Sequence, residues 1–178
     1  SGIAPAATQP SDFTGAGGTL NFTGTAGETK TITITVNGDT RVEPNETFKV
    51  VLSTVTNATG KNVTIPTIGK TAIGTITNND GATFAINDAT IVEGNTGTST
   101  LSFTVTLSEA IEATSAITVS FTTTNGTATA GEDYVATSGT LSFSGTKGET
   151  KTVTVTINGD QKIELDQNFN VVISNVQS

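Results

Sequence analysis

A long internal repeat constrains this chain more than any other feature. The segment Asp12–Val55 recurs as Asp133–Val176, so that equivalent residues lie 121 positions apart. Substitutions between the two copies keep their chemical class, as in the pair Ile32 and Val153. Self-similarity at a fixed period indicates that one structural unit occurs twice.

The length of the repeat also predicts that both copies are incomplete. The copies meet near Asn78–Gly81, which divides the chain into modules at residues 1–80 and 81–178. Copy one has no counterpart of residues 82–121, and copy two has no counterpart of residues 58–80. We therefore expect an internal piece of a longer tandem protein. Because the junction has almost no slack, we expect its modules to stack end to end.

Strict alternation of apolar residues with threonine predicts an all-β fold. In Thr31–Val36, for example, every second residue is apolar, as expected for a strand with one face on a core and one in water. Glycine and asparagine interrupt these runs, as in the turns of a β-sandwich. The other predicted strands are Phe48–Leu52, Thr71–Thr77, Thr83–Ile86, Leu101–Leu107, Ile117–Phe121, Thr152–Ile157 and Phe169–Ile173.

Composition excludes several classes of function. The chain has no cysteine and no histidine, which removes thiol chemistry, disulfides and the commonest transition-metal ligand. A net charge of −8 argues against nucleic acid as a partner, because nucleic-acid binding needs a basic surface. No apolar run is long enough to cross a membrane, and no signal peptide is visible at the first residues.

The sequence does not predict an enzyme. A histidine base is impossible, and no motif resembles a nucleophile elbow or a lysine-activated serine. Paired carboxylates can hydrolyse glycosides, but eight phenylalanines and one tyrosine offer few aromatic platforms for sugars.

Acidic residues concentrate in the turns between predicted strands. Calcium takes six to eight oxygen ligands, so carboxylates from several loops at one end of a sandwich can supply a site. Turn residues of this type are also commonly solvated or bonded to nearby backbone, and Asn37-Gly38 before Asp39 is a strong hairpin signal. The sequence pattern alone is compatible with both interpretations, a metal site and ordinary turns. The turn carboxylates are Asp12, Asp39, Glu43 and Glu46 in copy one, and Glu93, Asp133, Asp160 and Glu164 in copy two.

Several motifs resemble those of the Calx-beta domain family. They are Thr-Ile-Val-Glu-Gly-Asn, Asn-Gly-Thr-Ala-Thr-Ala-Gly-Glu-Asp-Tyr, Ser-Gly-Thr-Leu-Ser-Phe and Gly-Glu-Thr-Lys-Thr-Val-Thr-Val in copy two, and Val-Glu-Pro-Asn-Glu-Thr-Phe in copy one. Gly-Thr-Ile-Thr-Asn-Asn-Asp is similar to the family's closing strand and terminal acidic cluster. The resemblance spans nearly the whole chain. It implies immunoglobulin-like Greek-key sandwiches in tandem, with Ca²⁺ held by loops at one end.

The resemblance also implies a set of metal ligands. Asn78 and Asn79 stand where the family usually has aspartates, and Gln167 stands where copy one has Glu46. Neither copy contains every part of a site, so we expect weak Ca²⁺ binding, in the range of extracellular modules of about 10⁻⁴–10⁻³ M. The implied ligands are Asp12, Asp39, Glu43, Asn79, Asp80, Glu93, Asp133, Asp160 and Glu164.

Three functional hypotheses follow. The leading one is a structural and adhesive module of an extracellular or cell-surface protein, part of a rod-like array or filament stiffened by Ca²⁺. A Ca²⁺ sensor that regulates an attached domain is the alternative, and a spacer without metal is the third. The expected partners are neighbouring modules of the same protein, with strand exchange between chains as one way to complete a module.

Overall fold

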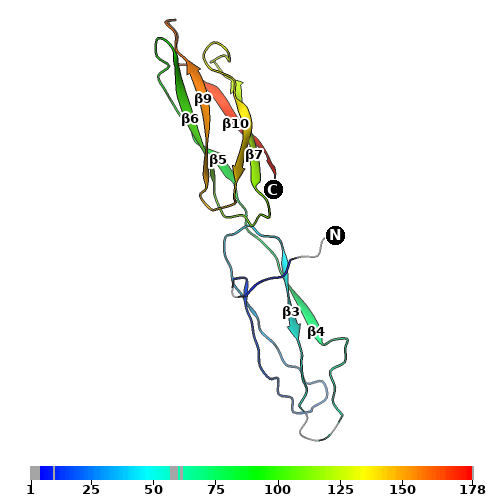
Figure 1. Ribbon diagram of the computed structural model, residues 1–178. Coiled ribbons are helices and arrows are strands. Elements are labelled where there is room, and N and C mark those ends of the chain that lie inside the picture. The colour runs from blue at the N-terminus through cyan, green and yellow to red at the C-terminus, as the bar shows by residue number, and fades with distance from the viewer. Residues whose placement is uncertain (1–4, 10, 57–59, 61, 178) are drawn as a thin grey trace. The chain divides into compact units, whose positions relative to one another are not determined.

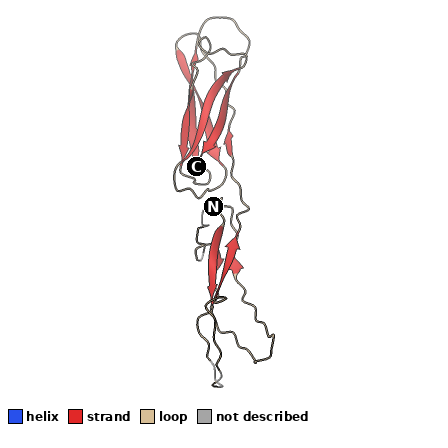
Figure 2. Cartoon of the chain, turned by 90° about the vertical axis from the view of Figure 1, so that its right-hand side faces the viewer, coloured by secondary structure: helices blue, strands red, loops and turns tan. Residues whose placement is uncertain are grey.

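The computed structural model describes residues 5–9, 11–56, 60 and 62–177. These residues form strands and no helix (Figure 2), which confirms the predicted all-β class. The described residues therefore contain no helix that is long and apolar enough to cross a membrane. The chain divides into two compact units (Figure 1). Unit 1 is Ser1–Asp39 with Glu43–Asn79, and unit 2 is Thr40–Val42 with Asp80–Ser178.

Unit 2 is a two-layer sandwich. One sheet has the order β5-β6-β9 and the other β10-β7-β8, with all neighbours antiparallel. β9 pairs with β6 and not with the preceding β8, so the chain crosses between the sheets as in a Greek-key sandwich. The strands are β5 (Phe84–Ile86), β6 (Thr98–Leu107), β7 (Ile117–Asn125), β8 (Ser138–Phe143), β9 (Thr150–Asn158) and β10 (Phe169–Gln177).

The core of unit 2 follows directly from the alternation in its sequence. Successive strand residues point to opposite faces, so every second side chain of β6 and β9 lies between the sheets while the threonines face water. Phe143 at the end of β8 is fully buried and packs against Phe84, with ring centroids 4.8 Å apart. The buried strand residues are Leu101, Phe103, Val105, Leu107, Ile117, Val119, Leu141, Phe143, Val153, Val155 and Ile157.

Unit 1 contains two short sheets. β1 (Phe13–Thr14) pairs with β2 (Thr35–Val36), and β3 (Glu46–Val51) pairs with β4 (Thr71–Ile76), both antiparallel. Phe13 stacks on Phe48 with ring centroids 4.8 Å apart. The equivalent residues of unit 2, Tyr134 and Phe169, stack in the same way at 4.4 Å.

The repeated Gly-Glu-Thr-Lys motif forms the same turn in both units. In unit 2 the carboxylate of Glu149 accepts hydrogen bonds from the backbone N–H and hydroxyl of Ser144, at 2.7 and 2.8 Å, and pairs with Lys151 at 3.0 Å. In unit 1 Glu28 accepts the same two bonds from Thr23, at 2.7 and 2.9 Å. The similarity of the two copies at this motif therefore reflects a structural turn.

One strand prediction is wrong over most of its length. Of the predicted strand Thr31–Val36, only Thr35 and Val36 are paired, because a strand needs a neighbour to bond with. The equivalent β9 is long because β6 pairs along it, and the described part of unit 1 has no strand corresponding to β6. The other predicted strands correspond to strands of the structure to within a few residues. The sequence analysis did not predict β1 or β8.

Candidate functional site

Three carboxylates gather in unit 1. One carboxylate oxygen from each of Asp12, Glu43 and Glu46 lies within 4.8 Å of the others. Asp12 directly precedes β1, and Glu46 is the first residue of β3. Asp12 and Glu46 are buried, and Glu43 is half-buried. Across the described residues this is the one group of three acidic side chains with that spacing.

A tight turn holds Asp12 in place. Its Oδ2 atom accepts hydrogen bonds from the backbone N–H of Thr8 and, at 2.9 Å, from the hydroxyl of Thr8. The Thr8 backbone bond is the main cause that lowers the pKa of Asp12. Partial desolvation opposes it, and further bonds with the side chains of Thr8, Ser11 and Glu46 support it. The carboxylate is therefore kept ionised and fixed, as a metal ligand has to be.

Amide side chains order the loop that carries Glu43. The Oδ1 atom of Asn78 accepts a hydrogen bond of 3.4 Å from the backbone N–H of Glu43. The backbone N–H of Asn78 in turn donates to Oδ1 of Asn45 at 3.0 Å. The segment that follows β4 is thus tied to the loop before β3.

This geometry fits a hard cation such as Ca²⁺. Two oxygens bound to one Ca²⁺ at 2.3–2.6 Å are separated by no more than about 5 Å, which matches the spacing of the three oxygens. When all three groups are ionised, carboxylates so close together repel one another, and a bound cation would remove that repulsion. The donors are oxygen atoms only, as Ca²⁺ prefers.

The equivalent positions of unit 2 are arranged differently. Gln167 replaces Glu46, and its Nε2 atom donates a 3.0 Å hydrogen bond to Oε2 of Glu164, the counterpart of Glu43. The other oxygen of Glu164 pairs with the ammonium group of Lys162, whose pKa is raised, mainly by this hydrogen bond. Asp133, the counterpart of Asp12, accepts a 2.6 Å bond from the backbone N–H of Thr129. The turn is therefore conserved between the units, and the three-carboxylate group is not.

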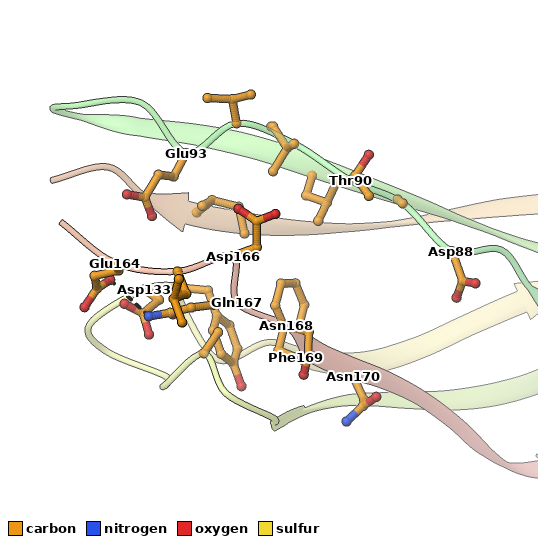
Figure 3. Close-up of a pocket in the computed structure, with 18 of the residues that line it drawn as sticks. Asp88, Thr90, Glu93, Asp133, Glu164, Asp166, Gln167, Asn168, Phe169 and Asn170 are labelled. Atoms are coloured by element: carbon orange, nitrogen blue, oxygen red, sulfur yellow. Dashed lines mark hydrogen bonds between the residues drawn. The ribbon is translucent and has the colours of Figure 1, made fainter. Parts of the chain in front are cut away.

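Some of the acidic residues of unit 2 line a cleft of about 1060 Å³, namely Asp88, Glu93, Asp133, Glu164 and Asp166. Figure 3 shows Asp133 and Glu164 on one side of it and Glu93 on the other. The apolar part of its lining includes Phe103 and Phe169. Glu93, Asp133 and Glu164 thus share one cleft without forming a close group of ligand atoms.

The remaining predicted ligands belong neither to the group of Asp12, Glu43 and Glu46 nor to the lining of the cleft in unit 2. Asp39 and Asp160 are exposed, and Oδ1 of Asp160 accepts a 2.7 Å bond from the backbone N–H of Lys162, as in an ordinary turn. Asn79 is the exposed last residue of unit 1, and Asp80 belongs to unit 2. The metal roles of all these residues stay predictions.

The sequence analysis noted Glu46 as a turn carboxylate but did not include it among the ligands. A signal was present, since Glu46 is three residues from Glu43 and changes to glutamine in the other copy. An acidic residue that one copy keeps and the other neutralises is a candidate for a function found in one copy only.

Comparison with known proteins identifies the repeated unit. The sequence model of the Calx-beta domain matches twice, over residues 5–80 and 77–178. No curated protein matches the chain. A solved structure of the Calx CBD1 domain in its apo form is 24% identical, with a TM-score of 0.39, over 44% of this chain and 66% of that one. CBD12 from CALX1.2 is 25% identical, with a TM-score of 0.36, over 80% of this chain and 53% of that one.

Proposed function

The chain belongs to the Calx-beta domain family, and on that premise we propose that it is a non-enzymatic structural module that binds Ca²⁺ weakly. The proposed setting is a rod-like tandem array or filament at the cell surface or outside the cell, with an adhesive role. The partners in this proposal are neighbouring modules of the same protein. Two matches of one domain family within one chain support the tandem arrangement.

The observation that carries the metal proposal is the carboxylate group of Asp12, Glu43 and Glu46. The sequence resemblance implies Ca²⁺, and these side chains supply oxygens at a spacing that suits it. Their charges repel in the absence of a cation, so Ca²⁺ would stiffen the loops around the group when it binds. A site of three carboxylates suits millimolar affinity better than the micromolar affinity of a sensor.

A thermal melt with Ca²⁺ or with chelator tests this proposal. A ligand that binds only the folded state stabilises it by RT ln(1 + [L]/Kd), about 1.4 kcal/mol for 10 mM Ca²⁺ and a Kd of 1 mM. For a unit of this size that raises the midpoint by roughly 5–10 °C. The shift should belong to unit 1, so the melt is followed by NMR peaks assigned to each unit.

Two glutamate-to-glutamine variants make the experiment specific. Glu46→Gln removes one ligand and should abolish most of the Ca²⁺-dependent shift. Glu112→Gln makes the same change at an exposed position of unit 2 and should leave the shift intact. An unchanged midpoint at 10 mM Ca²⁺, or an equal loss in both variants, would sink the Asp12–Glu43–Glu46 site and leave the spacer hypothesis.

A further inference from the structure

The outer face of the sheet formed by β5, β6 and β9 carries two rows of hydroxyl groups. Because alternate side chains of β6 and β9 point into the core, the side chains between them share the opposite face of the sheet. The two strands pair directly (Figure 1), so the rows face each other, Thr100 with Thr156 and Thr104 with Thr152. The row on β6 is Thr98, Thr100, Ser102, Thr104 and Thr106, and the row on β9 is Thr150, Thr152, Thr154 and Thr156.

These two rows form an uncharged surface on an acidic chain. They contain no acidic, basic or aromatic residue, whereas the whole chain has a net charge of −8. All of their residues are exposed except Thr106 and Thr156, which are half-buried, and β5 adds the exposed methyl group of Ala85 beside Thr106. No side-chain hydrogen bond joins these hydroxyls to other described residues, whereas the hydroxyls of Thr137 and Ser144 are engaged in turns. The hydroxyl groups are therefore available to a partner outside the fold.

The internal repeat keeps the threonines of this surface and changes the core beneath them. All four threonines of the β9 row are also threonine in copy one, whereas each of the three apolar residues that alternate with them differs between the copies. Substitutions at exposed positions usually cost little stability, so the fold itself leaves such positions free to vary. Threonine favours strands, but valine, isoleucine and tyrosine do so too. The identity of the exposed residues therefore indicates a requirement from outside the fold. The threonines of copy one are Thr29, Thr31, Thr33 and Thr35.

The composition of the two rows limits the kind of partner. Nucleic acid requires basic side chains, and protein interfaces rely on aromatic and arginine anchors, and the rows contain neither. They offer hydroxyl and methyl groups at regular distances. Residues two apart along a strand lie about 6.6–6.8 Å apart, and facing residues of an antiparallel pair lie about 4.5–5.5 Å apart. Oxygen atoms on the prism faces of ice repeat at similar distances in two perpendicular directions.

We propose that the outer face of β6 and β9 binds the surface of ice crystals. The hydroxyl groups bond to water molecules at lattice positions, and the threonine methyl groups lie between those water molecules. Ice has no net charge, which matches a face without ionised groups. The twist of a sheet, about 20–25° between adjacent strands, limits the match to the central pairs, so binding is weak for one module and increases with the number of modules. The inference names a surface for the proposed adhesive role and rests on that role for its setting.

Incorporation into growing ice tests the proposal on the full chain, in chelator so that Ca²⁺ plays no part. Ice is grown slowly from a stirred solution of the fluorescently labelled chain, and the protein concentrations in the ice and in the remaining liquid are compared. The chain should be retained in the ice, whereas a protein without affinity for ice is excluded into the liquid. Failure of the Ca²⁺ melt would leave this result intact, and exclusion from ice would leave the Ca²⁺ result intact.

Two threonine-to-lysine variants provide matched controls. Thr154→Lys places a strongly hydrated ammonium group in the β9 row and should lower incorporation by about ten-fold. Thr140→Lys makes the same change at an exposed position of β8, in the other sheet, and should behave like wild type. Both variants should keep the melting midpoint of wild type, because both positions are exposed.

Two results would overturn the inference, namely exclusion of the wild-type chain from ice and equal incorporation of the two variants. A wild-type chain that is excluded from ice but forms dimers, which Thr154→Lys dissociates, would assign the face to a second copy and overturn the inference too. Light scattering at several concentrations measures the dimers.

Discussion

Nearly the same sequence has two different environments in the two units. Phe22 is 57% exposed, and its counterpart Phe143 is 0% exposed. Ile32 is 40% exposed, and its counterpart Val153 is 1% exposed. In unit 2 these positions are covered because β6 pairs with β9 and the second sheet packs opposite them. The hydrophobic pattern therefore indicates which side chains can be buried. The neighbouring strands determine whether they are buried.

In the acidic loops, the unit with the smaller core is the one that has the close group of carboxylates. The weakly packed unit 1 holds three carboxylates together, and the well-packed unit 2 replaces one of them by Gln167 and engages Glu164 with Lys162. Unit 2 is stabilised by its core. Unit 1 has a small core and, in our proposal, Ca²⁺ to stabilise its loops.

The largest difference in stability between the units is expected for the variants Phe143→Ala and Phe22→Ala. Phe143→Ala should destabilise unit 2 by about 3–5 kcal/mol, because it removes a buried ring from the core. Phe22→Ala should change the stability of unit 1 by less than about 1 kcal/mol, as for most exposed positions. Urea denaturation followed by NMR peaks of each unit measures both. Equal losses would mean that Phe22 is buried in solution.

The second-largest difference between the units is expected for the variants Glu149→Gln and Glu28→Gln. Partial burial raises the pKa of Glu149, but bonds from Lys151 and from the hydroxyl and backbone of Ser144 outweigh it, and the pKa falls to about 2. A depressed folded pKa stabilises the fold above the unfolded value of 4.5 and loses that effect as the pH falls toward 2. Glu149→Gln should cost about 1–2 kcal/mol at pH 7. The difference from wild type should shrink as the pH falls from 4.5 toward 2, and Glu28→Gln should show a smaller effect. Unfolding curves between pH 7 and pH 2 measure this, and a pH-independent difference would contradict it.

A third carboxylate in unit 2 sharpens the comparison of the loops. In chelator, Gln167→Glu should destabilise unit 2 by about 1 kcal/mol, because it removes the bond to Glu164 and adds a like charge. With Ca²⁺ it should give unit 2 a stronger binding response than that of the parent, seen as shifted NMR peaks of Asp133 and Glu164. A response no stronger than that of wild type would show that the number of carboxylates does not separate the units.

The smallest expected difference concerns the repeated ion pairs. Lys151→Ala and Lys30→Ala each remove a surface pair with glutamate, 3.0 and 2.9 Å long, and a cation–π contact with Phe143 or Phe22. Each should cost less than about 1 kcal/mol, with Lys151 slightly the larger because its partner ring is buried. Denaturation at low and high salt checks both, and a loss above 2 kcal/mol would contradict the assignment as surface pairs.

The sequence by itself determined the β class, the repeat and the turns. Period-two alternation is a property of each segment alone, and Gly-Glu-Thr-Lys forms the same bonded turn in both units because its contacts lie within five residues. Asp12 and Asp133 likewise take the same local bonds from Thr8 and Thr129. Contacts of this kind involve only residues that are close in the sequence, so the same sequence motif forms the same local structure in both units.

Tertiary structure alone decided the rest. Thr31–Ile34 is not a strand although Thr152–Val155 is, because pairing depends on a neighbour such as β6. The grouping of Asp12 with Glu46, and the pairing of β9 with β6, depend on which distant segments lie side by side. Strand pairing and ligand groups are long-range contacts, and a repeated sequence makes different ones wherever its neighbours differ.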